Sequence, residues 1–139
     1  MSAPRDSRLL GLSTADRGSG VTVLRVSGEI DTATVGRFAD AVRASVGGAP
    51  TLVLDLSAVG YLGSRGLHCL AAAHRCATDL GTRLVVEPGR ANRAVWRPLE
   101  VSGLDAVLEV GHAPYPAPRD GDGRPAVGNG SRRVPRTTV

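Results

Sequence analysis

Residues 52–67 read LVLDLSAVGYLGSRGL, and this stretch decides the fold. Its first three residues, Leu52 to Leu54, are a continuous apolar run of strand length, which is typical of a strand covered on both faces or well shielded by helices. The glycine-flanked residues that follow it open a helix, which we expect to run from about Arg65 to Leu80 and to end at Gly81. The stretch therefore predicts a buried strand that leads into a helix through a short loop.

Upstream of this stretch the chain predicts a hairpin and a helix. Residues 8–12 and 21–26 have the composition of two strands, and the turn-rich residues 16–20 join them. Residues 32–44 carry apolar side chains at helical spacing, so they predict an amphipathic helix. Asp31, or the threonine that follows it, can cap the start of this helix.

Downstream, a strand–helix–strand pattern completes the domain. Residues 84–86 predict another buried strand, and residues 92–101 predict a helix that Pro98 strains or shortens. Residues 106–110 predict the last strand. The order ββαβαβαβ predicts an α/β fold with a mixed sheet of about five strands and three to four helices.

Three loops of this pattern should meet at one edge of the sheet. The loops span residues 28–31, 57–64 and 88–89, and each of them follows a predicted strand. Because binding sites in open α/β sheets gather at the carboxyl ends of the strands, this edge is the expected functional face.

Length and composition indicate one domain with two appendages. The chain has 139 residues, of which 42% are hydrophobic. We expect a loose arm at residues 1–7, a domain at residues 8–110 and a disordered tail at residues 111–139, because about a third of that tail is Pro or Gly. No apolar run approaches the roughly 20 residues that span a membrane, and the start lacks a secretory signal, so we expect a cytoplasmic protein.

The net charge of +4 does not indicate nucleic-acid binding. Residues 10–110 hold ten Arg against ten Asp and Glu, so the folded part has no net charge to attract a polyanion. The surplus lies at the two ends of the chain, with five Arg against two Asp after residue 110. A nucleic-acid binder acting through its tail is therefore a weak alternative.

The chain holds four motifs in order: GEID at residues 28–31, LVLDLS at 52–57, YLGSRGL at 61–67 and LEVSGL at 99–104. Together they resemble a STAS domain of the anti-sigma factor antagonist type. The resemblance covers residues 8–110 and implies a STAS-like fold that binds an anti-sigma factor and so frees a sigma factor. In the best understood cases this partner is a GHKL-type serine kinase. A STAS module serving another sensor or a ligand-binding assembly is the alternative.

The resemblance also assigns a partner-binding loop. In the family this loop reads as a hydrophobic pair, Asp, Ser, Ser or Thr, Gly and a hydrophobic residue, and its second hydroxyl accepts phosphate. Gly63 stands where the Asp is expected, and Arg65 stands where the phosphate acceptor is expected. Asp31 corresponds to the family's Asp before the first helix. The loop residues that match the family pattern are Tyr61, Leu62, Ser64, Gly66 and Leu67.

A phosphate on a hydroxyl at a helix N-terminus faces unpaired amides and the positive end of the helix dipole. It also adds about −1.5 to −2 charges to any interface, so it can switch binding off. Arg65 cannot be phosphorylated. The chain is then either locked in its binding form, or it accepts phosphate on the neighbouring Ser64 instead. A purely structural interpretation is that Ser64 is the N-cap of the helix, a role that contributes about 1 kcal/mol to helix stability. Asp31 can serve as a cap, a partner contact or both.

Other chemistry is poorly supported. Ser64 lacks the first glycine of a nucleophile elbow and has no histidine base in a strand-end loop, so we expect no enzyme activity. The sequence has no glycine-rich phosphate loop and implies no cofactor. Trp96 either packs on the sheet or forms a partner contact. One cluster has residue types that bind metals: His68, Cys69, His74 and Cys76. Its two cysteines fall on the apolar, core-facing side of the predicted helix and its two histidines project away from that side, so core packing explains the cluster better than a metal site does.

Overall fold

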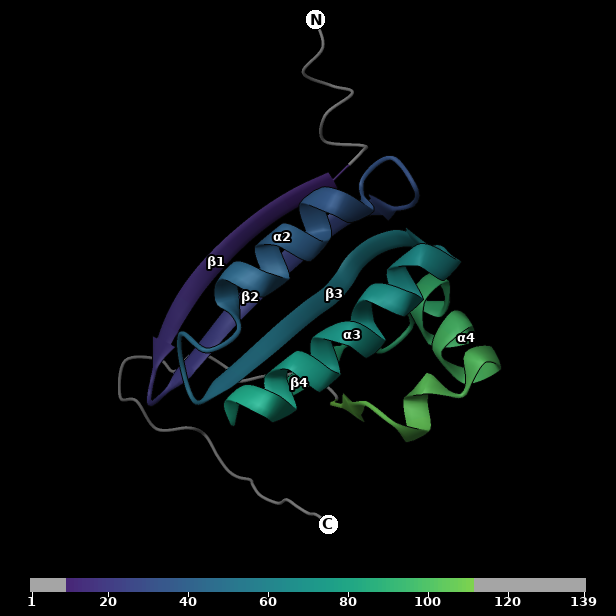
Figure 1. Cartoon of the computed structure of the whole chain (residues 1–139). Helices are drawn as coiled ribbons and strands as arrows, with labels where there is room; N and C mark the ends of the chain where they lie inside the picture. The colour runs from purple at the N-terminus through teal and green to yellow at the C-terminus, as the bar shows by residue number, and fades with distance from the viewer. Residues whose placement is uncertain (1–9, 112–139) are drawn as a thin grey trace, which may run out of the picture.

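The computed structural model describes residues 10–111. The predicted arm at residues 1–7, the first two residues of the predicted first strand and all but the first residue of the predicted tail lie outside this range. The element order confirms the predicted ββαβαβαβ pattern (Figure 1). The elements are β1 (Leu10–Gly18), β2 (Val21–Ile30), α2 (Val35–Ser45), β3 (Thr51–Leu62), α3 (Ser64–Leu80), β4 (Arg83–Glu87), α4 (Arg93–Ser102), a 3₁₀ helix η1 (Leu104–Ala106) and β5 (Glu109–Val110).

The five strands form one mixed sheet in the order β1-β2-β3-β4-β5. β1 pairs with β2 in antiparallel fashion, and all other neighbours are parallel. Helices α2 and α3 lie side by side over one face of the sheet, and α4 packs against β3 near its carboxyl end (Figure 1). The predicted mixed α/β fold is confirmed.

The core is aliphatic, as the scarcity of aromatic residues requires. Leu24, Leu54 and Val86 occupy matching positions on three neighbouring strands and are at most 1% exposed. Phe38 of α2 is fully buried in the same cluster. On the other face Val23, Val53 and Val85 form a second buried row across the same strands. The apolar run in β3 is therefore buried on both faces, as predicted.

The first hairpin turns later than the sequence predicts. β1 continues through Asp16, which pairs with Thr22, and a bulge follows before Gly18. The chain reverses at Ser19 and Gly20, whose φ angles of 58° and 78° suit a tight hairpin turn. The polar residues that precede the turn resemble a loop in the sequence because β1 is an edge strand with solvent-exposed side chains.

β2 and β3 are also longer than predicted. β2 runs to Ile30 instead of residue 26, and β3 runs to Leu62 instead of residue 54. The predicted loops at residues 28–31 and 57–64 are therefore mostly strand. Two irregularities in the register interrupt the regular side-chain alternation in this part, which explains why the sequence pattern is weak there.

The helices agree better with prediction. α3 ends at Gly81, which adopts the left-handed conformation at φ 74°. α2 begins at Val35, three residues later than expected. α4 continues through Pro98 over its full predicted length, so the expected shortening is wrong. The last predicted strand is reduced to Glu109–Val110 because the residues before it form η1 and a turn. Among residues 10–111, none of the helices is both long and apolar enough to span a bilayer.

Two leucines on α3 provide a matched test of this packing. Leu70 is completely buried and Leu80 is 59% exposed. We expect Leu70→Ala to lower the free energy of unfolding by about 2–5 kcal/mol, because it leaves a cavity under α3. Leu80→Ala should change it by no more than about 0.5 kcal/mol. Urea unfolding measures both, and equal losses would contradict the position of α3.

Candidate functional site

The ends of β2 and β3 hold the two expected functional turns side by side. Glu29 pairs with Tyr61, and Ile30 pairs with Leu62. Beyond the last pair, the backbone N–H of Gly63 donates to the carbonyl of Ile30 at 3.0 Å. The turn before α2 and the turn before α3 therefore start from adjacent, hydrogen-bonded backbone, which confirms that these two loops meet.

Asp31 closes the turn that leads into α2. Its Oδ1 accepts hydrogen bonds from the amides of Ala33 at 3.0 Å and Thr34 at 3.1 Å. In return, the Thr34 hydroxyl accepts from the Asp31 amide at 3.0 Å and donates to the Glu29 carbonyl at 2.7 Å. This reciprocal arrangement has the pattern of a capping box, but it closes the turn that precedes α2. The N-cap of α2 is Thr34, which makes no side-chain capping bond, so Asp31 stabilises this turn and does not cap the regular helix as expected. The partner of Asp31 in this box, Thr34, was missed in the sequence.

The start of α3 differs from prediction in one respect. Gly63 has extended backbone and occupies the N-cap position, and Ser64 is the first helical residue. The amide of Leu67 donates to the Gly63 carbonyl at 3.1 Å and closes the first turn. The structural reading of Ser64 as the N-cap is therefore wrong, because glycine, which has no side chain, takes that position. The Ser64 side chain is exposed and makes no capping hydrogen bond.

Gly66 sets how closely α3 approaches the sheet. It is buried, and a Cβ added there would lie 2.6 Å from Cδ1 of Leu62 and 2.7 Å from Cγ2 of Ile30. Ile30 is itself fully buried. Only glycine lets the first turn of α3 rest directly on the paired strand ends.

The predicted loop residues divide into two groups. Leu62 is buried and Leu67 packs against the core, so both hold the loop in place. Tyr61 is 51% exposed, and Ser64 and Arg65 are also exposed. These three side chains are available to a partner.

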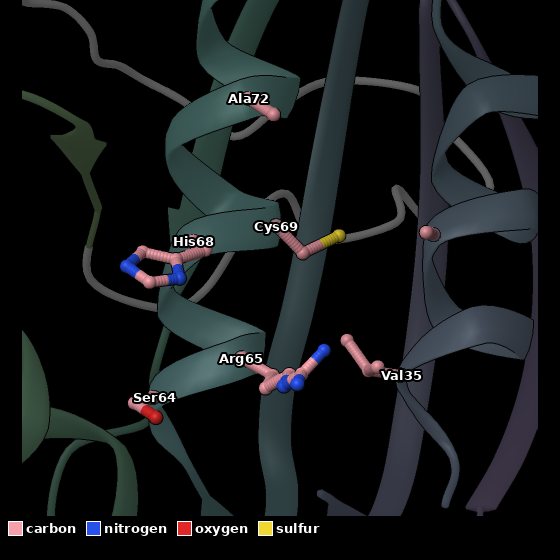
Figure 2. A pocket seen from close by; sticks show the side chains of 7 residues that line it. Val35, Ser64, Arg65, His68, Cys69 and Ala72 are labelled. Carbon is pink, nitrogen blue, oxygen red and sulfur yellow. The ribbon is translucent and has the colours of Figure 1, made fainter. Parts of the chain in front are cut away.

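A groove of about 530 Å³ separates the starts of α2 and α3. In Figure 2 the Arg65 side chain extends across it toward Val35 of α2, and the sulfur of Cys69 also points toward α2. Ser64 and His68 also line the groove, from the side of α3 that is farther from α2 (Figure 2). The groove thus combines a cation with an apolar floor.

The two cysteines line a smaller cavity of about 240 Å³ farther along α2 and α3. Both are half-buried free thiols packed against the core, as the helix stripe predicts. Burial raises the pKa of the Cys69 thiol, and the Arg43 cation opposes this effect in part. Within residues 10–111, no three His, Cys, Asp or Glu side chains gather closely enough to hold a metal ion.

The third expected loop contacts β3 before its end. The side-chain amide of Asn92 donates to the carbonyls of Val59 at 2.9 Å and Leu56 at 3.1 Å. The indole N–H of Trp96 donates to the Gly89 carbonyl at 2.9 Å, so the half-buried Trp96 holds this loop. Asn92 precedes α4 and could be identified in the sequence only as a cap; its bonds to β3 depend on the tertiary structure.

Two helical glycines provide a test of the close approach at Gly66. We expect Gly66→Ala to destabilise the fold by about 1–3 kcal/mol, because the new methyl group clashes with Ile30. Gly36→Ala is the control, since a Cβ at Gly36 meets no atom within 4 Å. This control should be neutral or stabilising by up to about 1 kcal/mol, the gain in helix propensity. Thermal or urea unfolding distinguishes them, and a stabilised Gly66→Ala would refute the contact.

Comparisons with known proteins agree with this geometry. A family model described as "Mlab, STAS domain" matches residues 13–109. The chain is 42% identical over 111 residues to the protein named anti-sigma-F factor antagonist RsfB of Mycobacterium tuberculosis, which covers 79% of this chain and 85% of RsfB.

Solved structures show the same relationship. A crystal structure of an anti-sigma factor antagonist from Mycobacterium paratuberculosis is 36% identical with a TM-score of 0.66, covering 79% of this chain and 89% of that one. The anti-sigma factor antagonist SpoIIAA in its unphosphorylated form is 15% identical, with a TM-score of 0.61 over 75% of this chain and 89% of that one, and shares the fold. The chain belongs to the STAS domain family.

Proposed function

We propose that this protein is an anti-sigma factor antagonist, which binds an anti-sigma factor and thereby frees a sigma factor. The observation that carries the proposal is the pairing of the turns before α2 and α3, which brings the exposed Tyr61, Ser64 and Arg65 to the same end of the sheet as Asp31. The names of the relatives support the same activity. The chain acts in the cytoplasm and performs no chemistry itself.

The surface is well suited to binding because its backbone is fixed in advance. The Gly63 hydrogen bond to Ile30, the Asp31 capping box and the packing of Gly66 all restrain the two turns. A partner then does not have to order these turns when it binds, and this reduces the entropic cost of association. The exposed Tyr61 and Arg65 are residue types that often contribute most to binding energy.

We further propose that the usual phosphate off-switch is absent. The resemblance to the family places the acceptor hydroxyl at residue 65, where this chain has an arginine that carries a permanent positive charge. Arg65 extends into the groove between α2 and α3 and offers a cation to the partner (Figure 2). A partner that is a GHKL-type serine kinase would bind this loop without being able to modify residue 65.

Release of a sigma factor tests the function directly. We expect the full-length chain to displace the sigma factor from its complex with the anti-sigma factor of the same organism, as measured by size-exclusion chromatography. Ser64→Glu should weaken this displacement at least about tenfold, because it buries a negative charge in the interface. Thr78→Glu, an exposed substitution farther along α3, is the matched control. A wild-type chain that leaves the complex intact at large molar excess would refute the proposal.

Restoring a hydroxyl at residue 65 tests the missing switch. We expect Arg65→Ser to become phosphorylated at residue 65 when it is incubated with the kinase partner and ATP, and the wild-type chain to remain unmodified. Arg75→Ser, at an exposed position one residue past His74 on the same helix, should also remain unmodified. Mass spectrometry locates the phosphate. Phosphate on Ser64 of the wild-type chain would contradict the missing switch without contradicting partner binding.

A further inference from the structure

A second groove lies on the other side of the α3 start, between the end of β3 and α4. Its volume is about 450 Å³, and its lining is mostly apolar. Tyr61 lines it from β3, while Pro98 and Val101 line it from α4. Neither the capping box nor the α2–α3 groove includes any part of α4.

The floor of this groove exposes large hydrophobic side chains. Tyr61 is 51% exposed and Val101 is 76% exposed, and both belong to the small set of large hydrophobics that the described residues leave in contact with solvent. Two such side chains in one groove are more than the scattered exposure that is normal for a protein surface. An aromatic ring with a polar hydroxyl at its tip is a typical anchor for a partner.

Two cations flank this floor. Arg93 and Arg97 are one helical turn apart on α4, and both line the groove. Both are exposed, and neither guanidinium forms an ion pair or a hydrogen bond with any residue of the described range 10–111. Glu29 pairs with Tyr61 on β2 and Glu100 belongs to α4, but neither glutamate lines the groove. Because the two charged residues that line the groove are both arginines, its α4 side is locally positive.

The groove is continuous with the surface at the start of α3. Tyr61 is separated from Gly63 by a single residue, and a Cβ added at Gly63 would lie 3.1 Å from the Tyr61 ring. The same ring thus borders both the second groove and the loop that opens α3. A partner that contacts Ser64 can reach α4 without leaving the protein surface.

We propose that this groove holds an acidic segment of the anti-sigma factor, with an apolar side chain placed over Tyr61 and Val101 and carboxylates facing Arg93 and Arg97. This inference rests on the proposed function. Residues 112–139 of the chain itself carry five Arg and two Asp, so they do not supply the required negative charge. An acidic partner segment supplies both the charge and the apolar anchor.

Charge reversal on α4 tests the proposal. The probe is the purified anti-sigma factor, and its affinity for the full-length chain is measured by calorimetry at two salt concentrations. We expect Arg93→Glu/Arg97→Glu to weaken binding about tenfold or more and to flatten the salt dependence, because both attractive charges become repulsive. Val101→Asp should weaken binding by a similar factor without altering either arginine.

Arg75→Glu, an exposed arginine on α3 outside this groove, is the control and should change affinity less than about twofold. Circular dichroism and urea unfolding confirm that each variant is folded. Wild-type affinity retained by both α4 variants would overturn this inference and leave the proposed function intact. A wild-type chain that does not bind the anti-sigma factor would overturn both.

Discussion

The parallel pairing of β2 with β3 beyond the end of β4 is the constraint on which the site depends. β4 leaves β3 after the pair Asp55–Glu87, whereas β2 follows β3 as far as the pair Ile30–Leu62. This extension carries the turns before α2 and α3 to the same height at one edge of the sheet. Gly66 then allows α3 to pack directly on Ile30, so the two turns are held in fixed relation. Without the extension, the turns that hold Asp31 and Ser64 would not start from adjacent, hydrogen-bonded backbone.

The residues that depart from the family pattern have a physical consequence at this edge. Gly63 provides the space that the Tyr61 ring occupies, because a side chain at this position would come within 3.1–3.4 Å of the ring. An aspartate there would have to displace the ring. Arg65 in turn occupies the groove beside Val35 (Figure 2). The chain thus lacks the acid and the hydroxyl of the family pattern and presents an exposed aromatic ring and a cation at this edge, which suits the proposed binding surface.

The sequence could predict the elements that have strong local signals. The apolar run in β3, the helix that ends at Gly81 and the order of strands and helices all follow from periodicity and turn residues. The length of β2 and β3 could not be predicted, because bulges and small or polar side chains near Gly28 and Ala58 break the strand pattern. The bonds from Asn92 to β3 were also beyond prediction, since they join residues more than thirty positions apart. The sequence could predict which residues form the candidate site, but it could not show that Tyr61 is exposed while Leu62 is buried.

The proposed function assigns the binding of an anti-sigma factor to the paired turns before α2 and α3. Backbone amide chemical shifts of the full-length chain, recorded before and after addition of that partner, test it most directly. We expect the largest changes on Asp31, Gly63 and the first turn of α3. Changes confined to β1, with these amides unaffected at saturation, would contradict it.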